Sequence, residues 1–448
     1  ALTGLGRDRR AALLLAPLAY GTFVFLGFLN FALSLPLYLL WLGHFCAHLD
    51  DATTTSQPSQ RRRTWMAGAL LGVLLYYGHV MTFAFAIGSA ALAVLLMPLP
   101  TRVRSQDQPS EAVGAALDSS HAGWTWIDAL RRGKALLQLA PGGLLLIGWL
   151  LGSETAGKGE LGRMIGGAMA HEPPRWDAPL DRIKVLLDHL LACYHDADDE
   201  WLLYALLTVL AAAALLRMSR PSVLADDAPG HVAPSSAPRT LPLALLLAAV
   251  VCGLLLPAAY RGIWPIAGRM APFVLMLLVL LPRGRLLGGR LWLAVGLGLC
   301  IATAVVHDRH FERFDAEVGP FDEVLAALPD GPRVMTLVFD NGSHIVTWPA
   351  FLHFSQYAIA AHGGVAEFSF VNFTKSPIHY RDADAPPQLP ARFEWTPERY
   401  DHAGDGAYYS HLLVRGAQAR VDLLLRRGGP AMRISKQAGR WTLYERAD

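Results

Sequence analysis

Long apolar blocks constrain the fold of this chain more than any other feature of its sequence. They recur from residue 11 to residue 306 and then stop. Only 17% of the residues are charged, whereas soluble domains average about a quarter. Blocks of this length and polarity predict helices that cross a lipid bilayer. The blocks are Ala11–Ala47, Trp65–Leu99, Leu136–Leu151, Trp201–Leu216, Leu241–Tyr260, Pro265–Leu281 and Leu291–Val306.

Arginine clusters between the blocks indicate how many crossings to expect. The first two blocks are long enough to hold two short helices each, with glycine-containing breaks at Phe25–Phe31 and Tyr76–Thr82. A count of about nine crossings then places every arginine cluster on one side, which the positive-inside rule makes the cytoplasmic side. The sequence therefore predicts a mainly α fold, a polytopic transmembrane helical bundle over residues 1–306.

The same topology assigns the polar segments and the surroundings of the chain. Residues 152–200 become an outer loop, and residues 100–135 and 217–240 become cytoplasmic linkers. The heavy use of Arg, Ala, Leu, Gly and Pro favours a bacterial origin. We therefore expect multi-pass insertion in the bacterial cytoplasmic (inner) membrane, with membrane lipid as a partner. We expect no nucleic-acid partner, although the net charge of +2 by itself argues nothing about one, and the lack of glycine-rich nucleotide motifs leaves a nucleotide-using enzyme unsupported.

Residues 307–448 have the pattern of a small soluble domain. A buried strand is expected at Val334–Phe339, after the Asp330-Gly331 turn, and a final hairpin is expected to turn at Ala438-Gly439. Strands alternate with helical segments here, which predicts an α/β domain with a largely parallel sheet. The topology above makes this domain extracytoplasmic.

The stretch LLYYGHVMTFAFAIG, from Leu74 to Gly88, contains the first candidate site. His79 stands with Tyr76 and Tyr77 inside an apolar run that holds no Lys, Arg, Asp or Glu. An ionisable group within a membrane is costly and usually functional. We expect these side chains to bind a lipid phosphate or a sugar in an outward-facing cleft. The alternative is a bend between two helices with an aromatic pair at the membrane interface.

Arg269 and Arg261 form the second candidate site. Arg269 lies four residues inside its apolar block, and a guanidinium there is suited to gripping a phosphate with two hydrogen bonds. The alternative is an arginine that extends to the membrane surface or pairs with an acidic residue of a loop. We expect the segments Tyr76–Thr82 and Arg261–Arg269 to converge on one cleft below the outer loop, with Arg269 facing protein.

The outer loop supplies two further candidates. His171, Glu172 and Trp176 surround a Pro-Pro pair, where Trp176 would stack on a sugar face and bind substrate. An acidic cluster of Asp196, Asp198 and Asp199 precedes an apolar block, and its D-A-D spacing suits a divalent metal ion. Acidic residues at a helix N-terminus also complement the helix dipole and need no ion.

Several segments resemble the GT-C-type integral-membrane glycosyltransferases of bacteria and their uncharacterised relatives. They are YGTFVFLGFLNFALSLPLYLLWL, LLGVLLYYGHVMTFAFAIGSAALAVLL, RGIWPIAGRMAPFVLMLLVLLPR and, in the last part, LPDGPRVMTLV, HGGVAEFSF and HLLVRG. The resemblance covers most of the chain. It implies transfer of a sugar from a polyprenyl-phosphate donor to a glycan or lipid acceptor on the outer membrane face.

The chain departs from the pattern of that family at its beginning. Members carry a catalytic acidic residue in a large outer loop after their first helix, and no such loop precedes Ala11. We expect either a chain whose catalytic loop lies upstream or a relative that does not transfer sugar. The alternative function is therefore a non-catalytic membrane scaffold or assembly factor whose α/β tail binds a partner.

Overall fold

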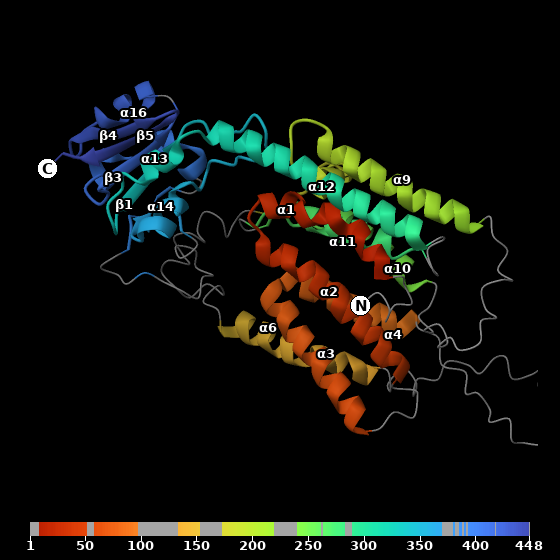
Figure 1. Ribbon diagram of the computed structural model, residues 1–448. Coiled ribbons are helices and arrows are strands. Elements are labelled where there is room, and N and C mark those ends of the chain that lie inside the picture. Colours follow the sequence, from red (N-terminus) through yellow and green to blue (C-terminus); the bar gives the residue numbers. More distant parts are fainter. Residues whose placement is uncertain are drawn as a thin grey trace, which may run out of the picture.

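The chain has a helical part and a smaller tail that carries a β-sheet (Figure 1). Long helix α12, Gly289–Val318, belongs to the helical part and leads directly into the tail. The computed structural model describes residues 9–51, 58–96, 133–152, 173–218, 240–260, 263–282, 289–369, 380, 385–387, 389–390, 393–416 and 418–447.

The helical part is built from helices of very different lengths. Its bounds are η2 Arg9–Tyr20, α1 Thr22–Phe25, α2 Leu29–Asp51, α3 Pro58–Gly78, α4 Val80–Leu96, η4 Lys134–Leu139, α6 Ala140–Gly152, α8 Pro179–Leu191, α9 Asp198–Met218, α10 Leu241–Leu255, η7 Ala267–Met270, α11 Ala271–Val279 and α12. Helix α12 lies along α9 and η2, while α3 packs against α2 and α6 (Figure 1). Both expected breaks exist, because α1 ends before Gly27 and α3 ends at Gly78.

The predicted bundle of about nine crossings is wrong. Within the described residues only two helices are long and apolar enough to cross a membrane, at Leu29–Leu49 and Arg290–Val318. The other apolar segments form shorter helices. The block Pro265–Leu281, for example, becomes a 3₁₀ turn and the nine-residue helix α11. Hydropathy records where apolar residues gather, but a crossing also needs about 20 of them in one unbroken helix.

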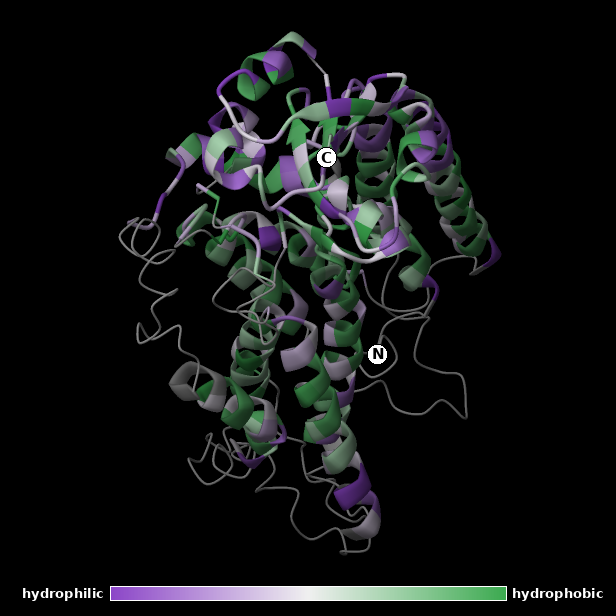
Figure 2. Cartoon of the chain, turned by 90° about the vertical axis from the view of Figure 1, so that its left-hand side faces the viewer, coloured by the Kyte–Doolittle hydropathy of each residue, from purple (hydrophilic) through white to green (hydrophobic). Residues whose placement is uncertain are grey.

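Apolar side chains nevertheless cover much of the outer surface of the helices. Leu33 is 72% exposed on α2, Leu144 is 68% exposed on α6, and Ile301 is 64% exposed on α12. Figure 2 shows hydrophobic residues along most helices and more hydrophilic residues over the tail. Exposed apolar surface on this scale indicates contact with another apolar phase or partner.

The tail contains a five-stranded sheet of order β2-β1-β3-β5-β4. Strands β2, β1 and β3 pair in parallel, whereas β5 pairs antiparallel with both β3 and β4. The sheet is therefore mixed rather than largely parallel. The two expected elements are present as β1 and as the β4–β5 hairpin. The bounds are α13 Phe321–Leu325, β1 Arg333–Val338, α14 Ser355–His362, β2 Val365–Ala366, η10 Phe393–Trp395, η11 Pro397–Arg399, α15 His402–Asp405, β3 His411–Arg415, α16 Gln418–Leu425, β4 Met432–Ala438 and β5 Trp441–Arg446.

Alternating side chains of the strands give the sheet two buried faces. Val334 and Leu413 pack with the residues of α13 and α14, including Phe321. Met335 and Leu412 point to the opposite face and pack with residues of α16. Helices on both faces explain why β1 and β3 are buried along nearly their whole length.

The tail is attached to the helical part through backbone hydrogen bonds as well as through α12. Tyr194 and Val346 form an isolated antiparallel bridge. Beside it, the N–H of His195 donates to the carbonyl of Ile345 at 3.1 Å, and the N–H of Thr347 donates to the carbonyl of Cys193 at 3.0 Å. The segment before α9 therefore holds the tail at a defined position.

Candidate functional site

His79 lies between the last residue of α3, Gly78, and the first residue of α4, Val80. Its carbonyl accepts the N–H of Phe83 at 3.0 Å, and its ring Nδ1 accepts the N–H of Met81 at 3.2 Å. The imidazole thus satisfies one of the backbone donors that every helix N-terminus leaves free. Gly78 permits the turn to approach α2, since a Cβ there would lie 3.2 Å from the Cβ of Ser34.

Arg269 reaches the same place from a distant part of the chain. The loop after α10 folds back, with the N–H groups of Ile266 and Ala267 donating to the carbonyls of Ala258 and Pro257. This return places Arg269 in the short helix η7, where it is only 6% exposed. Its Nη1 lies 3.1 Å from Nε2 of His79. The two segments meet at His79 and Arg269, and Arg269 faces protein, as expected. The expected cleft below the outer loop involves Arg261 and residues 153–172, which lie outside the described residues.

The surroundings of the Arg269 guanidinium are apolar. It lies 4.7 Å from the ring centroid of Phe28 and 6.0 Å from that of Phe31, and Nη1 also contacts the sulfur of Met81 at 3.7 Å. Its Nε is buried and has no hydrogen-bond acceptor among the described residues. Over the part of the chain that the structure describes, no carboxylate forms an ion pair with Arg269. A buried cation without a counter-charge is energetically costly.

The contact between Arg269 and His79 leaves a donor unsatisfied in either neutral tautomer of the ring. With Nδ1 accepting from Met81, the ring proton sits on Nε2 and faces the N–H of Arg269. With the proton on Nδ1, Nε2 accepts from Arg269, but Nδ1–H then faces the N–H of Met81. An anionic oxygen beside this pair would accept hydrogen bonds from both Nε2–H and Nη1–H, and its charge would neutralise Arg269.

The two tyrosines of the stretch make different contacts. The hydroxyl of Tyr76 donates to the carbonyl of Leu145 at 3.3 Å, which ties α3 to α6. Tyr77 is 69% exposed and packs edge-on against Tyr76, with ring centroids 5.3 Å apart. Among the contacts that the described residues make with Arg269, neither tyrosine takes part, so the polar centre consists of His79 and Arg269.

Of the remaining candidates for substrate binding, the structure describes only Trp176. Trp176 is 48% exposed, and its indole N–H donates to the carbonyl of Leu255 at 3.1 Å. It thereby satisfies a free carbonyl at the C-terminus of α10, as Arg182 does at Leu254. Arg261, His171 and Glu172 lie outside the described residues.

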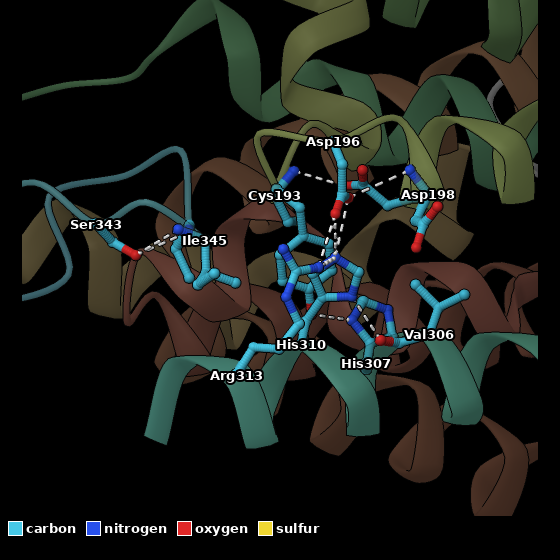
Figure 3. A network of polar contacts seen from close by, with 12 residues as sticks. Cys193, Asp196, Asp198, Val306, His307, His310, Arg313, Ser343 and Ile345 are labelled. Atoms are coloured by element: carbon cyan, nitrogen blue, oxygen red, sulfur yellow. Dashed lines mark hydrogen bonds and ion pairs between the residues drawn. The ribbon is translucent and has the colours of Figure 1, made fainter. Parts of the chain in front are cut away.

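Asp196, just before α9, and Asp198, its first residue, belong to a second polar cluster (Figure 3). Both carboxylate oxygens of Asp196 lie 2.9 Å from Nε2 of His310 on α12, and Nη1 of Arg313 lies 2.9 Å from Oδ2 of Asp196. Asp198 completes a group whose potential ligand atoms all lie within 4.8 Å of one another. Neighbouring contacts extend the cluster, since the hydroxyl of Tyr194 lies 2.6 Å from Nδ1 of His307.

Asp199 is separate from this group, although the sequence placed it with Asp196 and Asp198. It is completely buried, and its Oδ2 accepts the N–H of Cys193 at 2.6 Å. Burial raises the pKa of Asp199 to about 7. Its role in the structure is to hold the segment before α9, and it does not face His310.

Sequence reasoning missed the residues that complete both centres. Phe28 and Met81 line the Arg269 guanidinium, and no pattern in the sequence pairs them with residue 269. His310 carried a detectable signal, because His307 and His310 are three residues apart and lie on one face of a helix. The predicted block ended at Val306, whereas α12 continues to Val318 and includes both histidines.

The two centres differ in the charge they present. Arg269 and His79 offer convergent donors in an apolar setting, which suits an anion. Asp196, Asp198 and His310 offer oxygen and nitrogen acceptors, which suit a cation. No protein-family model, curated protein or solved structure matches the chain.

Proposed function

We propose that this chain is an integral membrane protein that binds a phosphorylated lipid at Arg269 and His79. We further propose that it serves as the lipid-binding part of a GT-C-like glycosyltransferase, which transfers a sugar from a polyprenyl-phosphate donor to a glycan or lipid acceptor. One observation carries the proposal: Arg269 is buried, faces a second potential donor and has no carboxylate partner among the described residues.

A phosphate group matches the chemistry of this centre. Its oxygens would accept from Nη1 of Arg269 and from Nε2 of His79, and a charged acceptor makes such bonds stronger than neutral ones. Helix α4 begins at Val80, directly after His79, so the positive end of that helix dipole adds to the attraction. The aromatic rings of Phe28 and Phe31 offer an apolar boundary for the lipid chain. During transfer, the same cation would stabilise the leaving phosphate.

The apolar surface supports placement in a membrane. Helices α2 and α12 contain the two candidate spans, and large apolar side chains are exposed on both. We place the protein in the bacterial cytoplasmic membrane, with the tail on the outer side. Lipid would then reach the Arg269 centre from the bilayer without crossing water.

Direct binding tests the proposal most sharply. The purified full-length chain in detergent is titrated with a polyprenyl phosphate and, separately, with the matching polyprenol. We expect Arg269→Ala to weaken phosphate binding at least about tenfold, because it removes a charge-assisted contact. Arg269→Lys keeps the charge but loses the two-pronged geometry, so its loss is expected to be smaller. Binding of the polyprenol should be the same in all three proteins.

The exposed Arg290 at the start of α12 provides a matched control. Arg290→Ala removes the same charge from a surface position and should leave lipid-phosphate binding unchanged. Equal affinity for phosphate and alcohol, or negligible effects of both Arg269 variants, would contradict the proposal.

A transfer assay separates the enzyme from the alternative scaffold. The chain is incubated with a polyprenyl-phosphate sugar labelled in the sugar and with a lipid acceptor, and labelled product is measured. Transfer that falls in Arg269→Ala supports the glycosyltransferase. Phosphate-dependent binding without transfer keeps the lipid site and takes the catalytic step away from this chain.

A further inference from the structure

The second polar cluster lies where the helical part meets the tail. His310 is on α12 and is only 1% exposed, whereas Asp196 and Asp198 lie in the turn and first residue of α9. Figure 3 shows the His310 ring and the Arg313 side chain directed toward Asp196. The ring of His310 also stacks on Tyr194, with centroids 3.8 Å apart, which fixes its orientation.

The hydrogen bonds of His310 determine which nitrogen is available. Its Nδ1–H donates a hydrogen bond to the carbonyl of Val306 at 2.7 Å, because a carbonyl can only accept. In the neutral ring, Nε2 therefore carries a lone pair. That lone pair faces both oxygens of Asp196 at 2.9 Å, so three acceptors meet in one place. Two cations satisfy this arrangement: a proton on Nε2, which makes His310 an imidazolium that pairs with Asp196, or a metal ion bound by Nε2 and the carboxylate.

We propose that Asp196, Asp198 and His310 bind a divalent transition-metal ion such as Zn²⁺ or Mn²⁺. Two carboxylates and one imidazole are ligands that such ions accept, and the imidazole nitrogen disfavours Ca²⁺ and Mg²⁺. The carbonyl of Val306 does not contact the ion but accepts a hydrogen bond from Nδ1–H, which holds His310 in the metal-binding tautomer. The inference is independent of the proposed lipid site.

Arg313 supplies the positive charge in the structure as described. Its Nη1 is 2.9 Å from Asp196 and 3.4 Å from Nε2 of His310. The side chain is 53% exposed, so it can leave the carboxylate for water at little cost. An ion that enters the site would replace Arg313 at Asp196.

An ion at this position would join two segments that are distant in sequence, and the first of them also bonds to the tail. His310 belongs to α12, which continues into the tail. Asp196 follows the segment that bonds to residues 345 and 347 of the tail, and Nε2 of His195 also lies 3.1 Å from the carbonyl of Ser343. We therefore infer that the metal stabilises the junction between the helical part and the tail.

The test uses the full-length chain after removal of metals with a chelator. Zn²⁺ and Mn²⁺ are titrated by calorimetry, with Ca²⁺ and Mg²⁺ for comparison, and the unfolding temperature is measured with and without each ion. We expect one transition-metal ion per chain and an unfolding temperature that rises with metal concentration. Asp198→Asn and His310→Gln should each weaken binding at least about tenfold.

The variants are chosen so that loss of folding cannot imitate loss of metal. Asp198 is exposed, so Asp198→Asn should fold as the wild type does, and Asp308→Asn removes an exposed carboxylate from α12 as a matched control. Arg313→Ala should bind the ion more tightly, since a competing cation is gone. The proposal is overturned if the wild type takes up no more ion than Asp198→Asn, or if His310→Gln binds as tightly as the wild type. An unchanged affinity in Arg313→Ala would also contradict it.

Discussion

Glu367 is a carboxyl group buried in the tail, just after β2, and is only 5% exposed. Its Oε2 accepts the N–H of Thr336 at 3.1 Å, and its Oε1 accepts the hydroxyl of Ser355 at 3.2 Å. Burial disfavours the charged form and raises the pKa of Glu367 to about 7, although both hydrogen bonds act in the opposite direction. A carboxyl whose pKa is higher in the folded state makes the fold less stable as pH rises.

We predict that Glu367→Gln removes this dependence on pH. In the wild type, the contribution of Glu367 is fully present below about pH 4.5 and is lost as pH rises through about 7, a change of up to about 3 kcal/mol. Glutamine imitates the protonated acid at every pH, so the variant should be the more stable protein at pH 8. Thermal unfolding of the full chain between pH 5 and pH 8 measures the difference. Parallel pH profiles for the variant and the wild type would refute the assignment, and the exposed Asp322→Asn serves as control.

At the scale of helices, close contacts depend on glycines whose missing side chain leaves room for a neighbour. A Cβ at Gly142 of α6 would lie 2.7 Å from the ring of Phe83 and 3.1 Å from the carbonyl of Gly72. Phe83 is completely buried and the carbonyl of Gly72 belongs to the backbone of α3, so neither yields easily. The next residue, Gly143, would meet nothing within 4 Å. Small residues at such positions let membrane helices approach closely.

We predict opposite effects for alanine at these two neighbouring glycines. Gly142→Ala should destabilise the packing of α6 on α3 and α4 by about 1–3 kcal/mol, because the new methyl group overpacks the contact. Gly143→Ala should be neutral or stabilise by up to about 1 kcal/mol, since alanine favours the helix. Unfolding temperatures of the two variants in detergent measure this. Equal shifts for both would show that α6 does not pack on α3 as described.

At the scale of the whole molecule, positive charges still orient the chain when only two helices are candidate spans. Arg61–Arg63 follow the first candidate span, and Arg283, Arg285 and Arg290 precede or begin the second. Both clusters lie between the two spans in the sequence, and the positive-inside rule places the clusters themselves on the cytoplasmic side. The tail then emerges on the outer side, as it would have with nine crossings.

We predict that a reporter active only in the cytoplasm stays inactive when it is fused after Asp448. The same reporter fused within residues 219–239, between the two candidate spans, should be active and serves as the positive control. Reporter activity would be measured in bacterial cells that express each fusion at matched levels. Strong activity from the fusion at Asp448 would place the tail in the cytoplasm and would contradict lipid access from the outer face.

Local sequence patterns predicted the features that depend on neighbouring residues. The breaks near Gly27 and Gly78, the strand β1 and the hairpin that turns after Ala438 all follow from turn residues and from the period of apolar positions. The rarity of a charged group in an apolar run also singled out His79 and Arg269. These signals act over a few residues, so one sequence contains them completely.

Only the tertiary structure decided how distant segments combine. His79 and Arg269 are 190 residues apart, and the cation site joins Asp196 to His310 across 114 residues. No local pattern encodes such distances, because they arise when the loop after α10 folds back and when α12 continues past its apolar block. The predicted number of membrane crossings was wrong for the same reason. Hydropathy sums apolar residues along the chain, whereas the bends that divide them into short helices depend on packing against the rest of the molecule.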